Sequence, residues 1–379
     1  MLKQIGLYLH FPFCIRRCPY CAFYSNPCES TEVFESFVEL LLGEFYFQLP
    51  QWRDARLLSI YFGGGTPSLL APKAIERLCD AAKSEFSIDA DLEVTLECNP
   101  GTVDVSKLED FAAAGVNRLS IGVQALNDDR LEFLGRIHRR NEAIQTVKIA
   151  KNLKELSVSV DLMIGAPLET RAGWDQEVDE LLELNPDAIS FYSLTIEEGT
   201  DFARRFDNGE EVYLPAEETV ELLLHVGERF RQAGFRHYEV SNWAKTGMEC
   251  RHNLHYWRRG LYLGLGPSAH SFDGTRRSWN APNLAGYSAS LQKRTLPPCE
   301  SEHLNPEAVR TEWVFLKLRQ DSGLDFKEYQ DLFGAVPQYW GIMFNRIAER
   351  GMGSFDGICF RPNDRGLLLA DEIAARILG

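Results

Sequence analysis

Three cysteines near the start of the chain have the clearest chemical potential. Cys14, Cys18 and Cys21 are spaced four and then three residues apart on one short segment. A [4Fe–4S] cluster normally takes one thiolate at each of its four irons. A loop that supplies three thiolates therefore leaves one iron open to another ligand. The spacing predicts a cluster-binding loop with one free coordination position, at which a bound ligand could react.

The same cysteines admit other interpretations. Cys18 and Cys21 alone form a Cys-x-x-Cys pair, typical of thioredoxin-like redox proteins. However, Cys14 lies close by, and a chain of 379 residues is several times longer than such a domain. A structural zinc site would need a fourth ligand, usually from a second Cys-x-x-Cys pair, and the sequence has none. Cys28 could be a fourth ligand, although a cysteine outside such a motif is more often a buried thiol that binds no metal. The cluster is the favoured interpretation.

The composition is that of a globular protein from a reducing compartment. Hydrophobic residues make up 45% and charged residues 25% of the chain, which is enough for a large core. A net charge of −15 argues against a general nucleic-acid or anionic-membrane surface. The first residues resemble a strand rather than a signal peptide, and no apolar run is as long as a membrane span. With nine cysteines, an odd number, we expect free thiols and a cytoplasmic location.

Strand-like and helix-like segments alternate along the first 240 residues, which is typical of a parallel sheet with crossover helices. The strands are expected at 5–10, 57–62, 92–97, 118–123, 157–163 and 188–194. The helices are expected at 31–48, 74–85, 105–114, 141–152, 173–184 and 216–233. Six strand–helix units are too few to close an eight-stranded barrel. The sequence therefore predicts an α/β fold with an open, partial (β/α)6 barrel.

Polar and glycine-rich motifs follow several of these strands. In folds of this kind the chemistry gathers at the C-terminal ends of parallel strands. Singly, each motif would be an ordinary turn or a solvated polar residue. Together they would place flexible backbone, acids, an amide and a cation around one mouth, which suits a zwitterionic, sugar-bearing ligand. The residues concerned are Gly64, Gly65, Thr66, Glu97, Gln124, Arg136 and Asp161.

In order and spacing, these motifs resemble the oxygen-independent coproporphyrinogen III oxidase family of radical S-adenosylmethionine (radical SAM) proteins, over roughly residues 5–270. The resemblance implies a radical SAM barrel in which Cys14, Cys18 and Cys21 bind the cluster. The amino and carboxylate groups of SAM would then close the open iron. The resemblance implies that the residues in contact with this SAM are Tyr8, Tyr20, Gly64, Gly65, Thr66 and Glu97. It also implies that a second SAM, found in the oxidase proper, would be surrounded by Gln124, Arg136 and Asp161.

Two departures separate the chain from the oxidases. The oxidases carry a further cysteine where this chain has Phe23, and a long N-terminal extension where only 13 residues precede Cys14. Both features are similar to the haem chaperones of the HemW type, in which Phe commonly holds that position. A His-Asn-x-x-Tyr-Trp element that starts at His252 is also typical of this branch. One mismatch is Ala22, where the branch usually has Asp.

The resemblance to this branch implies that haem or a porphyrin is the cargo, and that the partner is a haem-accepting protein, including one associated with a membrane. His252 and His255 are candidate haem contacts because haem iron takes His axially. A histidine in an aromatic stretch is nevertheless more often a hydrogen-bonded structural residue. The alternative function is a radical enzyme that oxidises a porphyrinogen propionate. Whether the chain is an enzyme stays open at this point, and a haem carrier is favoured.

The character of the chain changes after residue 300. Helices are expected at 303–318, 325–333 and 340–349, followed by a hairpin from 353–361 and 366–369 and a last segment at 371–378. Helices followed by a hairpin resemble a winged helix, but basic residues are not dense on one face, so DNA binding is not favoured. We expect a lid or docking cap over the barrel. The predicted domains are a radical SAM core at 1–240, a connecting segment at 241–300 and a small, winged-helix-like C-terminal domain at 301–379.

Overall fold

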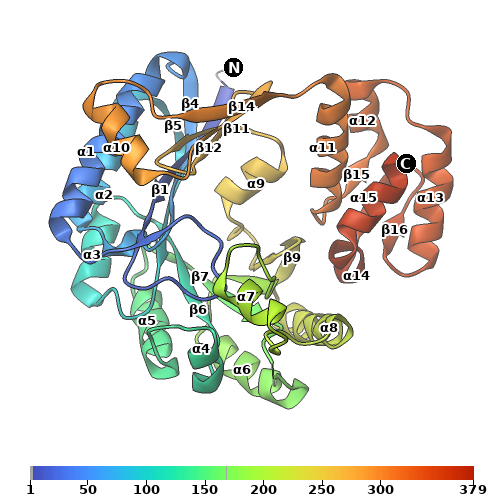
Figure 1. Ribbon diagram of the computed structural model, residues 1–379. Helices are drawn as coiled ribbons and strands as arrows, with labels where there is room; N and C mark the ends of the chain where they lie inside the picture. Colours follow the sequence, from blue (N-terminus) through green and yellow to red (C-terminus); the bar gives the residue numbers. More distant parts are fainter. Residues whose placement is uncertain (1–2, 168) are drawn as a thin grey trace.

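The computed structural model describes residues 3–167 and 169–379. Within these residues the chain forms a curved 12-stranded sheet, in which six strands run parallel in sequence order. The main crossover helices that follow these strands lie outside this sheet (Figure 1). The six parallel strands are β1 (Lys3–Phe11), β4 (Ala55–Gly64), β5 (Ser87–Cys98), β6 (Arg118–Gln124), β7 (Ser157–Ile164) and β8 (Ala188–Ser193).

One crossover helix or more follows each of these strands. Side-chain caps fix several helix starts, because Ser30, Asp104 and Thr170 each accept a hydrogen bond from a backbone N–H of the first turn. The predicted partial (β/α)6 barrel is confirmed, and the main elements end within a few residues of the expected positions. The helices that cover the outer face are α1 (Thr31–Gln48), α2 (Pro72–Glu85), α3 (Val105–Ala113), α5 (Arg140–Asn152), α6 (Arg171–Glu183) and α8 (Ala216–Gln232).

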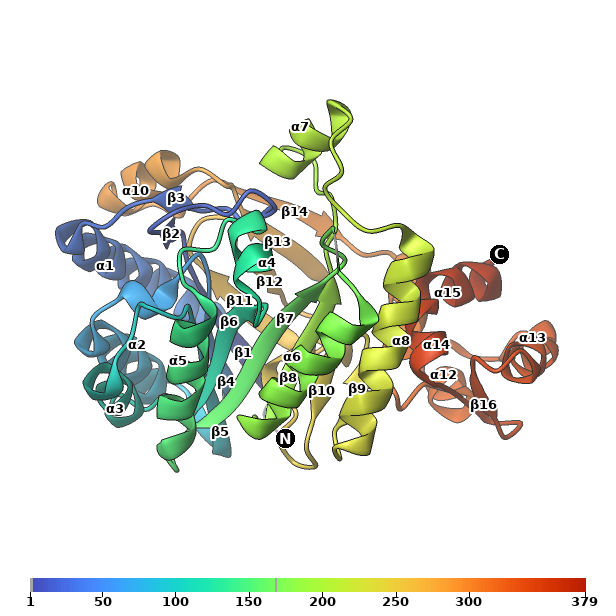
Figure 2. The same cartoon turned by 90° about the horizontal axis from the view of Figure 1, so that it is seen from below.

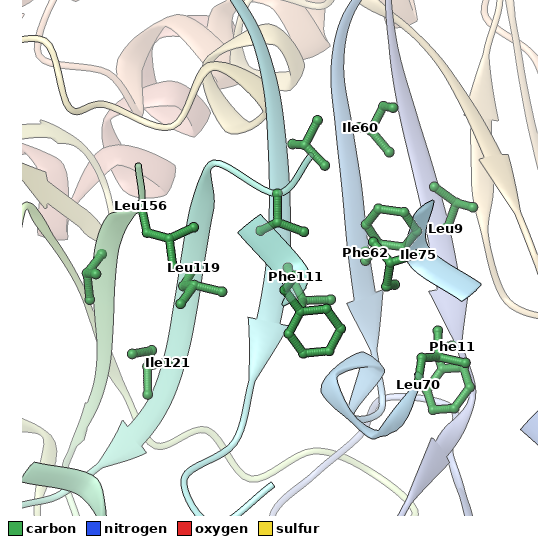
Figure 3. Packing of buried hydrophobic residues seen from close by; sticks show 14 of the residues in the cluster. Leu9, Phe11, Ile60, Phe62, Leu70, Ile75, Phe111, Leu119, Ile121 and Leu156 are labelled. Atoms are coloured by element: carbon green, nitrogen blue, oxygen red, sulfur yellow. The ribbon is translucent and has the colours of Figure 1, made fainter. Parts of the chain in front are cut away.

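Alternate residues of each parallel strand face opposite sides of the sheet. The outward side chains are apolar and pack against the helices, as Ile60 and Phe62 do with Ile75 and Phe111 (Figure 3). The inward side chains are largely polar, and Tyr61 on the same strand is one of them. This alternation creates a hydrophobic shell around a polar interior, and the polar interior supplies the candidate site.

Residues 236–303 extend the sheet at both edges. β9 (Arg236–Glu239) and β10 (Asn242–Ala244) add antiparallel beyond β8. At the other edge β11 (Leu261–Leu265) runs parallel to β1, and β12 (His270–Phe272), β13 (Arg276–Asn280) and β14 (Cys299–His303) continue antiparallel. Two helices belong to this segment, α9 (Arg251–Trp257), which contacts β4, and α10 (Leu284–Gln292), which contacts α1.

The C-terminal region has a hydrophobic core of its own, around Trp340, Phe344 and Phe360. The order of its elements is helix, strand, helix, helix and hairpin, as in a winged helix. These elements are α11 (Pro306–Leu318), β15 (Leu324–Asp325), α12 (Phe326–Phe333), α13 (Gln338–Glu349), β16 (Gly353–Phe355) and β17 (Cys359–Pro362), followed by α14 (Asp364–Leu368) and α15 (Ala370–Leu378). The domain boundaries at 240 and 300 stay a prediction.

One expectation for this region was wrong. Residues 366–369, predicted as the second strand of a hairpin, lie in and just after α14, and the hairpin is formed by β16 and β17 instead. The side chain of Asn363 accepts a hydrogen bond from the Gly366 N–H at 3.1 Å, which starts a helix directly after β17. An apolar run after a capping residue therefore became a helix.

The C-terminal region packs against the flank of the barrel at α8 rather than over the strand ends (Figure 2). Asp364 links the two parts, since it pairs with Arg231 of α8 and its Oδ1 lies 3.1 Å from His237 Nδ1. Gln320 Nε2 also donates to the Trp257 carbonyl at 3.0 Å. No helix within the described residues is long and apolar enough to cross a membrane.

Candidate cluster and SAM site

A cavity of about 540 Å³ lies at the C-terminal ends of the parallel strands. Its walls come from the loop after β1 and from the ends of β4 to β8. None of the side chains that line it comes from the C-terminal region within the described ranges. The structure brings together the predicted cluster and SAM residues here, with the exception of Tyr8. Those that line the cavity are Cys14, Cys18, Tyr20, Cys21, Gly64, Gly65, Thr66, Glu97, Gln124, Arg136 and Asp161.

The cysteine loop is held by short strands and by contacts to distant elements. β2 (Phe13–Cys14) pairs with β3 (Asn26–Pro27), so the loop between them closes on itself. Thr66 Oγ1 lies 3.5 Å from Cys14 Sγ, and Arg136 Nη1 lies 3.6 Å from Cys18 Sγ. Burial raises the pKa of the Cys14 and Cys21 thiols, so their deprotonation would accompany metal binding.

This donor set fits a cluster rather than a single ion. Within residues 3–167 and 169–379, no three His, Cys, Asp or Glu side chains converge on one metal position. A cubane attaches each thiolate to a different iron, so its ligands do not need a common centre. The hydrogen bonds from Thr66 and Arg136 would stabilise negative charge on the sulfurs. Cys28 packs against the hydrophobic core and does not line the cavity.

Two buried carboxyl groups lie on the cavity wall. Glu97 accepts hydrogen bonds from the Tyr61 hydroxyl and the Gly64 N–H, both at 3.1 Å, and Ser120 donates to Asp161 at 2.9 Å. Burial raises the pKa of Glu97 to about 7, and the charge of Asp161 adds to this shift. Burial also raises the pKa of Asp161. A cationic ligand would favour the ionised forms, and SAM carries both an ammonium and a sulfonium group.

The glycine run has a structural role that the sequence did not reveal. Gly64 has a φ of +109°, and a Cβ there would lie 2.6 Å from the ring of His10. A Cβ at Gly65 would lie 2.4 Å from the Phe13 carbonyl oxygen. The glycines therefore let the end of β4 approach β1 and the cysteine loop closely. A Cβ at either position would clash with the protein itself, whereas the sequence motif suggested close approach of a ligand.

The three residues predicted for a second SAM also line this cavity. Arg136 Nη2 donates to the Gly122 carbonyl at 2.7 Å and contacts Asn99 Oδ1. Gln124 has a φ of +67°, which is uncommon outside glycine and often marks functional sites. The Tyr192 hydroxyl donates to Gln124 Oε1 at 2.9 Å. These contacts hold the amide and the guanidinium in fixed positions around one side of the cavity.

Sequence reasoning missed four side chains that build this site: Tyr61, Asn99, Ser120 and Tyr192. Three of them occupy inward positions of β4, β6 and β8. Their polar character at alternate strand positions was the available signal. Asn99 lies beside Glu97 in the same strand-end motif and could have been included for that reason.

Three predicted residues, Tyr8, His252 and His255, lie outside this cavity. The Tyr8 hydroxyl hydrogen-bonds to His10 Nδ1 at 3.1 Å. His252 is buried, with Nδ1 2.8 Å from the Ser59 hydroxyl and Nε2 2.8 Å from the Tyr256 hydroxyl.

Burial lowers the pKa of His252 to about 3, so the ring is neutral. His255 Nε2 donates to the Leu261 carbonyl at 2.7 Å. Leu261 pairs with Ile5, near the start of β1, so His255 lies toward the opposite end of the barrel. The structure does not bring the two histidines to the cavity, and their haem contact stays a prediction.

Comparisons with known proteins agree with this geometry. The radical SAM superfamily model matches residues 8–184. Heme chaperone HemW of Escherichia coli is 38% identical over 270 residues, which cover 71% of this chain and 70% of that protein. Heme chaperone HemW of Mycobacterium tuberculosis is 35% identical over 385 residues, with coverage of 100% and 95%.

A solved structure shares the fold. Coproporphyrinogen III oxidase (HemN) from Escherichia coli, described as a radical SAM enzyme, superposes with a TM-score of 0.84 at 21% identity. The match covers 98% of this chain and 89% of that one. From the family model and the two relatives of substantial identity and coverage, the chain belongs to the radical SAM superfamily and, within it, to the family of the Heme chaperone HemW proteins.

Proposed function

We propose that this protein is a haem chaperone, which carries a [4Fe–4S] cluster and SAM, binds haem and transfers it to an acceptor. The observation that carries the proposal is the likeness to a HemW protein at 35% identity over the whole chain, C-terminal region included. The likeness to the oxidase, at 21% identity, supports the fold alone. The acceptor we propose is a haem protein met in the cytoplasm or at a membrane surface.

Different residues of the cavity would hold the cluster and SAM. Cys14, Cys18 and Cys21 would ligate the cluster, and Glu97 would accept a hydrogen bond from the ammonium group of SAM. Bound together, cluster and SAM supply one-electron chemistry at the sulfonium. Arg136 would hold the cysteine loop in place through Cys18 and balance the negative charge of the sulfurs.

One observation favours a second candidate, a coproporphyrinogen oxidase or related radical enzyme. Gln124, Arg136 and Asp161 line the same cavity as the cysteines, as a second SAM site of the oxidase type would require. Against this, the position of the further oxidase cysteine holds Phe23, whose side chain is 69% exposed at the cavity rim. A radical enzyme has to shield its substrate from water, and an exposed phenylalanine offers little shielding. We therefore favour the carrier.

The test uses the full chain, reconstituted anaerobically with iron and sulfide and then supplied with SAM and dithionite. We expect one haem to bind per chain, seen as a Soret band, and no protoporphyrinogen IX to form from coproporphyrinogen III. A variant with Cys14, Cys18 and Cys21 all changed to Ala is the control that lacks the cluster. Sustained turnover of coproporphyrinogen III by the reconstituted wild type would overturn the carrier in favour of the enzyme.

A further inference from the structure

A second cavity, of about 770 Å³, lies between the barrel and the C-terminal region. Pockets for small-molecule ligands measure roughly 300–1,000 Å³. One wall comes from the segment after β8 and from α8, and the other from the α13–β16 turn and α14. Among the residues that the structure describes, the lining of this cavity includes a tyrosine and a methionine but no acidic residue, histidine or cysteine. We call this space the interdomain cavity.

The barrel wall of the interdomain cavity is largely apolar and open to solvent. Phe206, Tyr213 and Val220 are 44%, 41% and 42% exposed, and all three line the cavity. The rings of Phe206 and Tyr213 lie 5.5 Å apart. Helix α8 buries Leu222 and Val226 in the barrel core, and its cavity side carries Val220. Large apolar side chains gathered at a hollow indicate a binding surface.

The opposite wall carries two cations. Arg350 and Arg365 both line the cavity and are both exposed. Across the described ranges, neither forms a salt bridge, whereas the neighbouring Arg361 pairs with Asp356 at 3.0 Å and Arg231 pairs with Asp364. Unpaired arginines beside an apolar hollow are notable in a chain of net charge −15. The combination suits a flat, apolar ligand that bears carboxylates at one edge.

Resting on the proposed function, we propose that haem binds in the interdomain cavity. The porphyrin face would pack on Phe206, Tyr213 and Val220, and the two propionates would pair with Arg350 and Arg365. Arginine is well suited to this role because its planar guanidinium binds a carboxylate through two parallel hydrogen bonds. The opposite wall also offers a donor that haem iron takes in proteins, a thioether at Met352.

The position of this cavity connects it to the cofactor site. Ser193, Leu194 and Thr195, which end β8 and begin the following loop, line both cavities. Haem bound here would therefore share a wall with the cluster and SAM. The shared segment provides a short physical path by which occupancy of one cavity could alter the other. An unrelated surface hollow would have no such link to the cofactors.

The experiment is a haem titration of the full chain, followed by Soret absorbance. The test variant is Arg350→Glu with Arg365→Glu, and the matched control is Arg346→Glu with Arg171→Glu, which makes the same charge change at exposed arginines of α13 and α6 outside the cavity. We expect the test variant to raise the Kd for haem by roughly tenfold or more, since charge-assisted hydrogen bonds are worth about that factor. The control should leave the Kd unchanged.

A second variant and two further probes make the outcome decisive. Val220→Trp fills the hollow without a change of charge and should also weaken haem binding, while circular dichroism confirms the fold. Metal-free protoporphyrin IX carries the same propionates and should respond to the arginine variant as haem does. Palmitate, an apolar carboxylate, should bind more weakly than haem; tighter binding of palmitate, weakened by both variants, would identify a fatty-acid site and overturn the proposal.

The two proposals fail in different ways. If the wild type binds no haem at all, the haem-chaperone function fails and the cavity assignment fails with it. If the wild type binds haem and both the arginine variant and Val220→Trp bind it equally well, the location is overturned while the function stands.

Discussion

Arg136 Nη1 lies 3.6 Å from Cys18 Sγ, although the two residues are 118 positions apart in the sequence. The contact joins the segment after α4 (Asp128–Phe133) to the cysteine loop. The same guanidinium donates to the Gly122 carbonyl at 2.7 Å, so it is anchored to β6. A barrel strand therefore positions the loop through one side chain, and that side chain also places positive charge beside a candidate cluster ligand.

The first prediction follows from this contact. Hydrogen bonds to the sulfurs help to set the potential of an iron–sulfur cluster. Arg136→Met should therefore lower the reduction potential, because the reduced cluster carries more negative charge and loses a donor. Because the bond exists in both oxidation states, a charge-assisted bond of about 1.5–3 kcal/mol sets an upper limit of roughly 65–130 mV on the shift for one electron. A redox titration monitored by electron paramagnetic resonance measures it. An unchanged potential would show that Arg136 does not act on the cluster, and Arg139→Met, at an exposed site, is the control.

The second prediction concerns the ligand set. Cys14→Ala, Cys18→Ala or Cys21→Ala should each abolish most of the broad cluster absorption near 400 nm, because two thiolates are too few to hold the cube. Cys28→Ala is the matched control, since this thiol packs against the core outside the cavity. Iron and sulfide analysis of the reconstituted proteins provides a second readout. A full cluster in Cys18→Ala, or loss of the cluster in Cys28→Ala, would show that the assigned set of cluster ligands is wrong.

The third prediction concerns Glu97 and pH. Burial, with the charge of Asp161, raises the pKa of Glu97 to about 7, above the ordinary value of 4.5. A group with a raised folded pKa contributes stability that is present below pH 4.5 and is lost as the pH rises to about 7. The difference corresponds to about 3 kcal/mol. Glu97→Gln should therefore stabilise the cluster-free protein at pH 8 by up to this amount, and have little effect at pH 4.5.

Denaturant unfolding at the two pH values measures this difference, with Glu109→Gln on the exposed side of α3 as the control. The same substitution should weaken SAM binding to the reconstituted protein by roughly tenfold, because the charged acceptor is lost. A gain in stability together with a loss of affinity would be the signature of a binding carboxylate. Equal stability of variant and wild type at pH 8 would contradict the raised pKa that we assign to Glu97.

The sequence predicted the barrel well because each parallel strand alternates between an apolar outer face and a polar inner one. Helix α1 was predicted over the same residues that it occupies, 31–48, because its apolar positions recur at helical spacing. The meeting of the cysteines with Glu97 and Asp161 also follows from topology, since parallel strands place their C-terminal ends at one edge.

Other features depend on tertiary packing that no local pattern encodes. The inward residues Tyr8 and His252 lie deeper in the barrel than the cavity, because β1 and α9 bring them into contact with Ser59 and Tyr61. The interdomain cavity unites Tyr213 with Arg350, which are far apart in the sequence. The contacts of Tyr8 and His252 are set by the packing of α9 on the sheet, and the interdomain cavity is set by the docking of the C-terminal region on α8. Neither kind of packing leaves a periodic signal in the sequence.

The last prediction tests the role that the structure gives to Gly64. His10 cannot easily move aside, because its Nε2 donates to the Tyr24 carbonyl at 2.8 Å. Gly64→Ala should therefore cost about 1–3 kcal/mol of stability from strain at positive φ, and more from the clash with His10. Gly199→Ala is the matched control, because Gly199 has a φ of +77° but no atom within 4 Å of its added Cβ. The difference between the two variants isolates the clash.

A double-mutant cycle then assigns this clash to its partner. In Gly64→Ala combined with His10→Ala the ring is gone, so the double variant should be more stable than the sum of the single effects predicts, by about 1 kcal/mol or more. Denaturant unfolding of the cluster-free proteins gives the four free energies of unfolding. Simple additivity would mean that the ring of His10 is not what requires a glycine at this position. In that case approach of a ligand to the backbone would again be the better explanation of the glycine run.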